Sequence, residues 1–132
     1  MRTLGVGETA SDLVIDSRVH WNVTGIVLGS NQTYRFETPS DAWWSDSSIR
    51  CGPEGYRKAL FRPLEGFRRV PQAAWFELVG AVGEDEPALF RIGRGCDYPV
   101  TRSGHLRLFA NDLWFMYWNN HGAISVNLTR VR

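Results

Sequence analysis

The sequence lacks the features that would assign it to a membrane or to nucleic acid. No apolar stretch approaches the roughly 18 residues that a membrane-spanning helix requires. The formal net charge is only +1, so we expect no basic surface for nucleic acid or for an acidic membrane. The N-terminal residues 1–5 contain no apolar core of a signal peptide. This predicts synthesis in the cytoplasm, and release from the cell stays open.

Cysteine and histidine are too scarce to define a catalytic or zinc site. The two cysteines, Cys51 and Cys96, allow either one disulfide or two free buried thiols. The three histidines, His20, His105 and His121, show no zinc-type spacing. Neither cysteine lies in a nucleophile motif. We therefore expect a binding protein without catalytic residues.

What the sequence does contain is a series of short strand-like runs with turn signals between them. Residues 33–37 alternate, with Tyr34 and Phe36 on one face, and no stretch shows a sustained helical period. The 132 residues suffice for one core, and no linker or repeat divides them. The pattern predicts a single all-β domain over residues 1–132, a small β-sandwich or jelly roll. Further strands are expected at 13–15, 19–28, 73–82, 88–92, 105–109 and 123–131.

The segment 42–71 interrupts this pattern. Proline and glycine recur too often there for a long strand or helix, and only a short helix over 56–61 fits. An irregular run of about 30 residues in a compact domain is usually functional. The segment begins with Trp43-Trp44, where one ring could stack on a sugar, or one could pack in the core beside an exposed neighbour.

Oxygen-bearing side chains gather near the C-terminus. Asn111-Asp112 precedes Asn119-Asn120 by a short stretch that lies between two strand-like runs. Carboxylate and amide oxygens are the ligands of calcium, which takes six to eight oxygens at roughly 2.3–2.6 Å. The same residues also suit an ordinary turn, because Asn tolerates left-handed backbone. The spacing alone leaves both interpretations open.

With its surroundings, this motif resembles the calcium-dependent galactophilic lectins of bacteria, the PA-I type, which are small β-sandwiches with a galactose-binding-domain-like fold. That family has Asn-Asp, four further residues, then Tyr-x-Asn-Asn-x-Gly and a strand that ends in Ser-Val-Asn and an aliphatic residue. The chain matches it at 111–112, 117–122 and 125–128. Cys-Gly-Pro-Glu-Gly at 51–55 is similar to the family's Trp-Gly-Pro-x-Gly, and Arg-Pro-Leu-Glu-Gly at 62–66 to its His-Pro-x-Gln-Gly.

The resemblance implies a bound calcium ion and a sugar on top of it. The implied metal ligands are the side chains of Asp112, Asn119 and Asn120 and the main-chain carbonyls of Met116 and Ser45, with Asp46 as the alternative to Ser45. The implied sugar contacts are Asp112 and Asn119 and, around the exocyclic hydroxymethyl group, Arg62, Pro63 and Glu65. Trp44 is the first candidate for stacking on the sugar ring.

The chain departs from the family in the loop that precedes the amide pair Asn119-Asn120. Residues 113–116 are bulky where the family has small residues, and Trp118 replaces a glycine. This loop could shield the core, wall the sugar pocket or form a subunit contact in a homo-oligomer. Arg62 and Glu65 replace His and Gln, so they could pair with each other or bond to hydroxyl groups.

The function implied is calcium-dependent binding of galactose or galactosides, with modest affinity at each site and several copies acting together. The alternative is a metal-free β-sandwich module that binds a protein or a different glycan.

Overall fold

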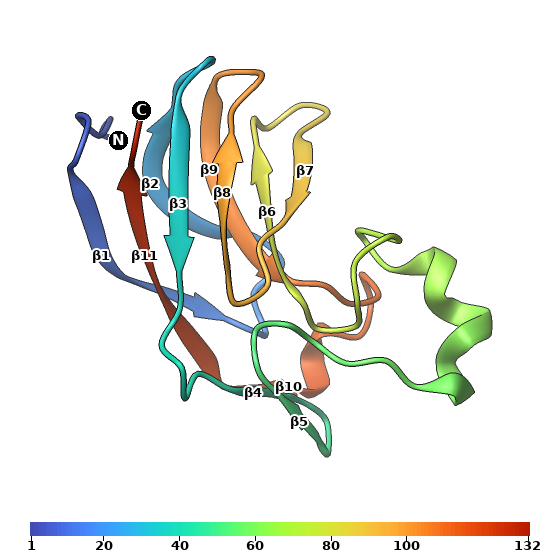
Figure 1. The fold of residues 1–132 in the computed structure, drawn as a ribbon. Helices are drawn as coiled ribbons and strands as arrows, with labels where there is room; N and C mark the ends of the chain where they lie inside the picture. The colour runs from blue at the N-terminus through green and yellow to red at the C-terminus, as the bar shows by residue number, and fades with distance from the viewer.

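Antiparallel strands form most of the regular secondary structure in the computed structural model, which describes all residues 1–132 (Figure 1). One sheet has the strand order β1-β11-β3-β8 and the other β2-β9-β6-β7, and a small third sheet, β10-β4-β5, lies at one end. The first sheet comprises β1 (Thr9–Asp16), β11 (Ala123–Arg130), β3 (Thr33–Glu37) and β8 (Gly95–Pro99); the second β2 (Asn22–Leu28), β9 (Gly104–Ala110), β6 (Leu78–Val82) and β7 (Ala88–Arg91); the third β10 (Asn120–His121), β4 (Trp44–Asp46) and β5 (Ile49–Cys51). The prediction of an all-β sandwich is confirmed.

The core lies between the two larger sheets. Successive side chains of a strand point to opposite faces, so Tyr34 and Phe36 of β3 are buried while Arg35 and Glu37 between and after them are exposed. Leu106 and Leu108 of β9 enter the same cluster of 20 buried residues from the opposite sheet. Burial of this apolar surface is the main force that holds the sheets together.

The strand expected at 73–82 begins only at Leu78. Phe76 has a φ of +60°, a left-handed conformation that interrupts an extended strand. Its backbone N–H donates to the carbonyl of Asn111, 2.7 Å away, and the preceding Trp75 pairs with Tyr56 instead. Residues 73–77 therefore form part of the loops at one end of the sandwich. Strand β8 was not expected at all.

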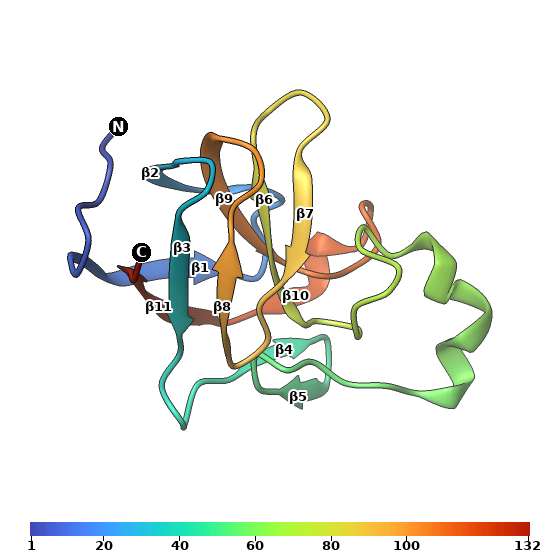
Figure 2. The same ribbon diagram turned by 45° about the horizontal axis from the view of Figure 1, so that its top comes forward.

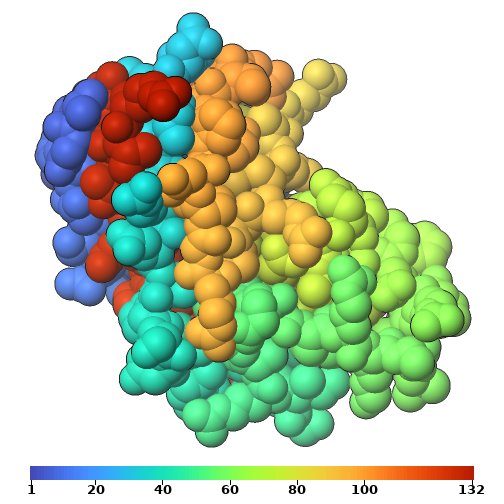
Figure 3. Space-filling model, in the orientation of Figure 1, coloured from blue at the N-terminus to red at the C-terminus, as the bar shows by residue number.

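The irregular segment contains a 3-10 helix, η1 (Ala59–Phe67). It is longer than the short helix predicted over 56–61, and it begins and ends further along the chain. It projects from the side of the sandwich in the ribbon and space-filling views (Figures 2 and 3). None of its residues is buried. Neither η1 nor the other 3-10 helix, η2 (Tyr117–Asn119), has the length and apolar character to cross a membrane.

Both cysteines are free thiols, which settles the question left open by the sequence. Cys51 and Cys96 each pack against the core cluster. Burial raises the pKa of Cys51 to about 12 and that of Cys96 to about 11, so neither is an activated nucleophile at neutral pH.

Candidate functional site

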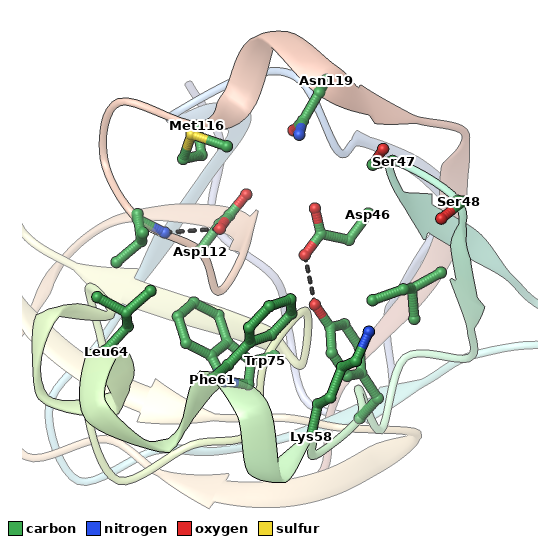
Figure 4. Close-up of a pocket in the computed structure, with 13 residues that line it drawn as sticks. Asp46, Ser47, Ser48, Lys58, Phe61, Leu64, Trp75, Asp112, Met116 and Asn119 are labelled. Atoms are coloured by element: carbon green, nitrogen blue, oxygen red, sulfur yellow. Dashed lines mark hydrogen bonds between the residues drawn. The ribbon is translucent and has the colours of Figure 1, made fainter.

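A cavity of about 270 Å³ opens at the end of the sandwich where the β4–β5 turn, η1 and the segment after β9 meet (Figure 4). One side is polar and the other largely apolar. The polar side carries Asp46, Ser47, Ser48, Asp112 and Asn119, and the rest of the lining consists of Ile49, Tyr56, Lys58, Phe61, Leu64, Trp75, Leu113 and Met116. The cavity thus offers oxygen ligands opposite an apolar wall.

Asp112 lies two residues beyond the end of β9 and is almost fully buried. Its Oδ1 accepts a hydrogen bond from the backbone N–H of Leu113, at 2.7 Å, whereas Oδ2 has no partner. Burial raises the pKa of this carboxyl to about 7, and the nearby charge of Asp46 adds to the effect. An opposing positive charge would reverse this shift.

Asp46, the last residue of β4, supplies the second carboxylate. The pairing of β4 with β10 sets Asp46 opposite Asn120 in the register. Its Oδ2 accepts a hydrogen bond from the hydroxyl of Tyr56, at 2.5 Å, and burial raises the pKa of Asp46 while this bond lowers it. The carboxylates of Asp46 and Asp112 point into the same space (Figure 4). Two carboxylates in one cavity, one buried and one partly buried, favour a cation there.

The amide pair adds two further oxygens. Asn119 ends η2, and its side chain points into the cavity. Its backbone carbonyl accepts a hydrogen bond from the backbone N–H of Ser47, at 3.1 Å. Asn120 is fully buried, and its amide nitrogen donates to the carbonyl of Ser17, at 2.8 Å. The side-chain oxygen of each is buried and has no hydrogen-bond partner.

Three of the side-chain oxygens expected to bind calcium are therefore unpartnered in the protein: Oδ2 of Asp112, Oδ1 of Asn119 and Oδ1 of Asn120. A buried acceptor without a partner costs about 1–3 kcal/mol, so such groups call for an explanation. Two of the three residues, Asp112 and Asn119, line the same cavity, and oxygens of this kind are ligands of a hard cation such as calcium. The chain has no group of three or more His, Cys, Asp and Glu side chains placed to hold a metal, so amide oxygens are essential to any such site.

Asn111, the first residue of the Asn-Asp pair, has a different task. Its side-chain oxygen accepts from the backbone N–H of Val70, and its amide nitrogen donates to the carbonyls of Val70, Ala73 and Ala74. It thereby fixes the loop 70–74 against the end of β9. The neighbouring Asp112 is left in a defined position.

Arg69, which precedes the loop 70–74, is hydrogen-bonded to both Asp112 and Tyr117 and so holds the segment between them. Its backbone N–H donates to the carbonyl of Asp112, at 3.2 Å, and its Nη1 donates to the hydroxyl of Tyr117, at 2.7 Å. The guanidinium also lies 3.6 Å from the ring centroid of Phe109 and 4.5 Å from that of Trp114. The aromatic partners of Arg69 lie far from it in the chain, so no local pattern in the sequence predicts this arrangement.

The structure brings together most of the predicted metal ligands but not all. Met116 lines the cavity, and Asn120 lies buried opposite Asp46. Ser45 does not line the cavity, whereas its neighbour Asp46 does. Side chains alternate along β4, which accounts for the difference between these two side chains; the predicted ligand at Ser45 is its main-chain carbonyl, which stays a prediction.

Trp44 is not available to a sugar. It is fully buried, its ring packs against Phe76, and its indole N–H donates to the carbonyl of Phe76 at 3.1 Å. Its neighbour Trp43 is 45% exposed and carries the guanidinium of Arg50 over its ring at 3.8 Å. The structure thus matches the alternative in which one ring packs in the core and its neighbour is exposed. The prediction that Trp44 stacks on a sugar is wrong.

The three predicted contacts on η1 face away from the carboxylates. Arg62 and Glu65 line a separate hollow, and Pro63 lines neither this hollow nor the cavity. Glu65 pairs with Arg57 and Arg68 rather than with Arg62.

The period of the helix explains which side chains replace them. A 3-10 helix has three residues per turn, so side chains three apart share a face. Lys58, just before η1, and Phe61 and Leu64 within it are on one such face and line the cavity. The three-residue spacing was visible in the sequence, but nothing there indicated a 3-10 helix.

The bulky loop at 113–116 serves one of its three predicted purposes, because it helps to wall the cavity. Leu113 and Met116 wall the cavity. Trp114, Phe115 and Trp118 are 53%, 71% and 68% exposed, an unusual amount of aromatic surface for one short loop.

Two antiparallel sheets with a loop-borne cavity at one end define a small all-β sandwich, and comparison with solved structures identifies its fold as lectin-like. The N-terminal domain of EclA, described as a PllA-like lectin, superposes with a TM-score of 0.68 at 18% sequence identity, over 92% of this chain and 97% of that one. No protein-family model and no curated protein matches the chain. The resemblance to lectins is thus confirmed at the level of the fold.

Proposed function

We propose that the chain is a calcium-dependent carbohydrate-binding domain that recognises galactose or galactosides at the cavity between Asp46, Asp112 and Asn119. The observation that carries the proposal is the set of three buried and unpartnered oxygens on Asp112, Asn119 and Asn120. Carboxylate and amide oxygens are the ligands that calcium binds, and these three accept no hydrogen bond in the structure. The lectin-like fold supports the same conclusion.

Asp112 would hold the ion through Oδ2, and Asn119 and Asn120 through their amide oxygens. Asp46 and the main-chain carbonyls of Met116 and Ser45 are the candidates for the remaining positions. Bound calcium supplies a positive charge and open coordination positions that two neighbouring sugar hydroxyls can fill. With two carboxylates at most, we expect a calcium affinity in the micromolar to millimolar range.

Asp112 and Asn119 would also accept or donate hydrogen bonds to those hydroxyls, which fixes the orientation of the sugar. Phe61 and Leu64 take over the apolar contact that Trp44 cannot make, since they line the cavity opposite the polar side. None of the histidines or cysteines lines the cavity. The proposed event is recognition without a chemical reaction.

We extend the proposal to a homo-oligomer that presents several sites together. A single shallow sugar site binds weakly, and linked sites gain affinity through effective concentration. The exposed rings of Phe115 and Trp118 are the surface that such an oligomer would bury.

The decisive experiment is a thermal unfolding series with chelator, with calcium, and with calcium plus galactose. A ligand that binds only the folded state raises stability by RT ln(1 + [L]/Kd). We expect one rise with calcium and a second with galactose. A second rise with glucose or mannose but none with galactose would support calcium-dependent sugar binding and refute the preference for galactose.

The alternative is a metal-free module that binds a protein or another glycan through the exposed aromatic loop. The exposure of Phe115 and Trp118 favours it, because such surface usually marks an interaction site. An unchanged unfolding curve in millimolar calcium would select this alternative.

A further inference from the structure

A second hollow, of about 240 Å³, adjoins the cavity on η1 and is lined by Arg57, Lys58, Ala59, Arg62 and Glu65. Three of these five residues are cationic. The single carboxylate, that of Glu65, is already paired with Arg57 at 3.9 Å and with Arg68 at 3.5 Å. Neither Lys58 nor Arg62 forms an ion pair in the structure. The hollow therefore has unused positive charge.

Lys58 connects this hollow to the cavity, because it lines both. Its ammonium lies 5.0 Å from the ring centroid of Phe61, which is part of the apolar wall (Figure 4). The three-residue period of a 3-10 helix gives the segment 58–65 two such faces. Lys58, Phe61 and Leu64 line the cavity, whereas Ala59, Arg62 and Glu65 line the hollow. A ligand bound at the carboxylate end can thus extend past Phe61 to the cations.

We infer that the natural ligand is an anionic glycan, a galactose-type sugar that carries a carboxylate or sulfate group, and that Lys58 and Arg62 bind this group. The inference rests on the proposed function, since it places the sugar hydroxyls at Asp112 and Asn119. The cavity concentrates its acidic groups at the proposed metal end, and Lys58, the one cation that lines it, is at the η1 end beside the cations of the second hollow. A neutral sugar leaves those cations without a partner, whereas an anionic one pairs with them.

The test compares three probes in calcium: methyl galactoside, a sulfated methyl galactoside and methyl galacturonoside. Exposed ion pairs contribute roughly 0.2–1 kcal/mol each, so we expect the anionic probes to bind about three- to tenfold more tightly than the neutral one at low ionic strength. This preference should shrink when salt is raised to about 0.15 M, where the screening length falls to about 8 Å. A preference for only one of the two anionic probes would identify the group that the site takes.

Variants separate the η1 cations from a direct contact of the acid with calcium. In Lys58→Gln/Arg62→Gln the ratio of anionic to neutral affinity should fall to about one. Both positions are exposed, so the fold should be kept, which the thermal midpoint checks. Arg18→Gln is the matched control, because Arg18 is exposed, forms no ion pair and lines neither hollow; its ratio should equal that of the unmodified protein.

Equal or weaker binding of both anionic probes would overturn the inference and leave the proposed function standing. A preference that survives in the double variant would also overturn it, since the anion would then bind elsewhere. Absence of binding for all three probes, with calcium present, would remove the proposed function and the inference together.

Discussion

The guanidinium of Arg69 donates a 2.7 Å hydrogen bond to the hydroxyl of Tyr117, which in turn donates to the carbonyl of Ala110. Ala110 ends β9 and Tyr117 begins η2, so this chain of bonds spans the loop that carries Asp112 and Met116. These hydrogen bonds tie the loop that carries the proposed calcium ligands to the sandwich. None of the residues that form them is itself a proposed ligand.

This link predicts the effect of removing the Arg69 guanidinium. Arg69→Met should lower the free energy of unfolding by about 1–3 kcal/mol, because the hydroxyl of Tyr117 loses a charged donor. Calcium affinity should fall as well, since the loop at Asp112 becomes less ordered. Chemical denaturation and calcium titration measure the two effects, and Arg69→Lys, which keeps the charge, should recover part of each. Unchanged calcium affinity in Arg69→Met would show that the loop is fixed by other contacts.

Asp112→Asn should abolish the response to calcium and to galactose while the fold remains intact. Without calcium the variant should be at least as stable as the unmodified protein at pH 8, because a buried charge with no partner on Oδ2 is removed. Asn119→Ala should likewise lose sugar binding. Asp85→Asn, at an exposed turn, is the control and should respond to calcium normally. Wild-type affinity in Asp112→Asn would refute the site.

The raised pKa of Asp112 gives the calcium-free protein a defined pH dependence. Because the pKa rises from the ordinary value of 3.8 to about 7 on folding, the folded state binds the proton more tightly than the unfolded state. Stability should therefore fall as the pH increases from about 4 to about 7 and change little above that. Asp46, whose pKa is also raised, contributes in the same direction. Thermal midpoints in chelator across this range measure the slope, and Asp112→Asn should flatten it.

Calcium binding should show the opposite pH dependence, because the metal requires the ionised carboxylate. Affinity should be higher at pH 8 than at pH 5.5, and binding near pH 6.5 should release protons. Calorimetry in two buffers with different ionisation enthalpies detects that release. An affinity that is equal at both pH values would mean that Asp112 does not bind the ion.

The exposed aromatic loop predicts the behaviour of an oligomer. Phe115→Ser/Trp118→Ser should sediment as a monomer, whereas the unmodified protein should sediment as a larger species if the proposed oligomer forms. The affinity for soluble galactoside should stay the same, and retention on a galactoside-coated surface should drop, because avidity depends on several linked sites. A monomeric unmodified protein at all concentrations would remove the oligomer from the proposal.

Local sequence patterns were sufficient for the fold. The run at 33–37 alternates strictly, and the strand β3 has the same bounds, because one buried face fixes the period. Strand β8 was not predicted, because Gly95 and Pro99 are its first and last residues and its side chains are at most partly buried. Such a strand is held by pairing with β3 rather than by its own pattern.

The candidate site was predictable only where its residues are close in sequence. Asp112, Asn119 and Asn120 belong to one short motif, and they gather at one place in the structure. Lys58 and Phe61 come from a distant segment, and their orientation depends on a 3-10 period that the composition of 42–71 conceals. The burial of Trp44 likewise depends on Phe76, far along the chain, so no local rule could decide between stacking and core packing.

The helix η1 contributes a face to the cavity yet buries none of its own residues. Substitutions along it therefore carry little cost for the stability of the sandwich, because its side chains are not part of the core. If the proposed function holds, the ligand preference can be redesigned by exchanging a few side chains on η1 while the proposed calcium ligands and the core stay unchanged. On η1, unlike at the buried Asp112 and Asn120, a residue can then change its contact with the ligand without changing the core.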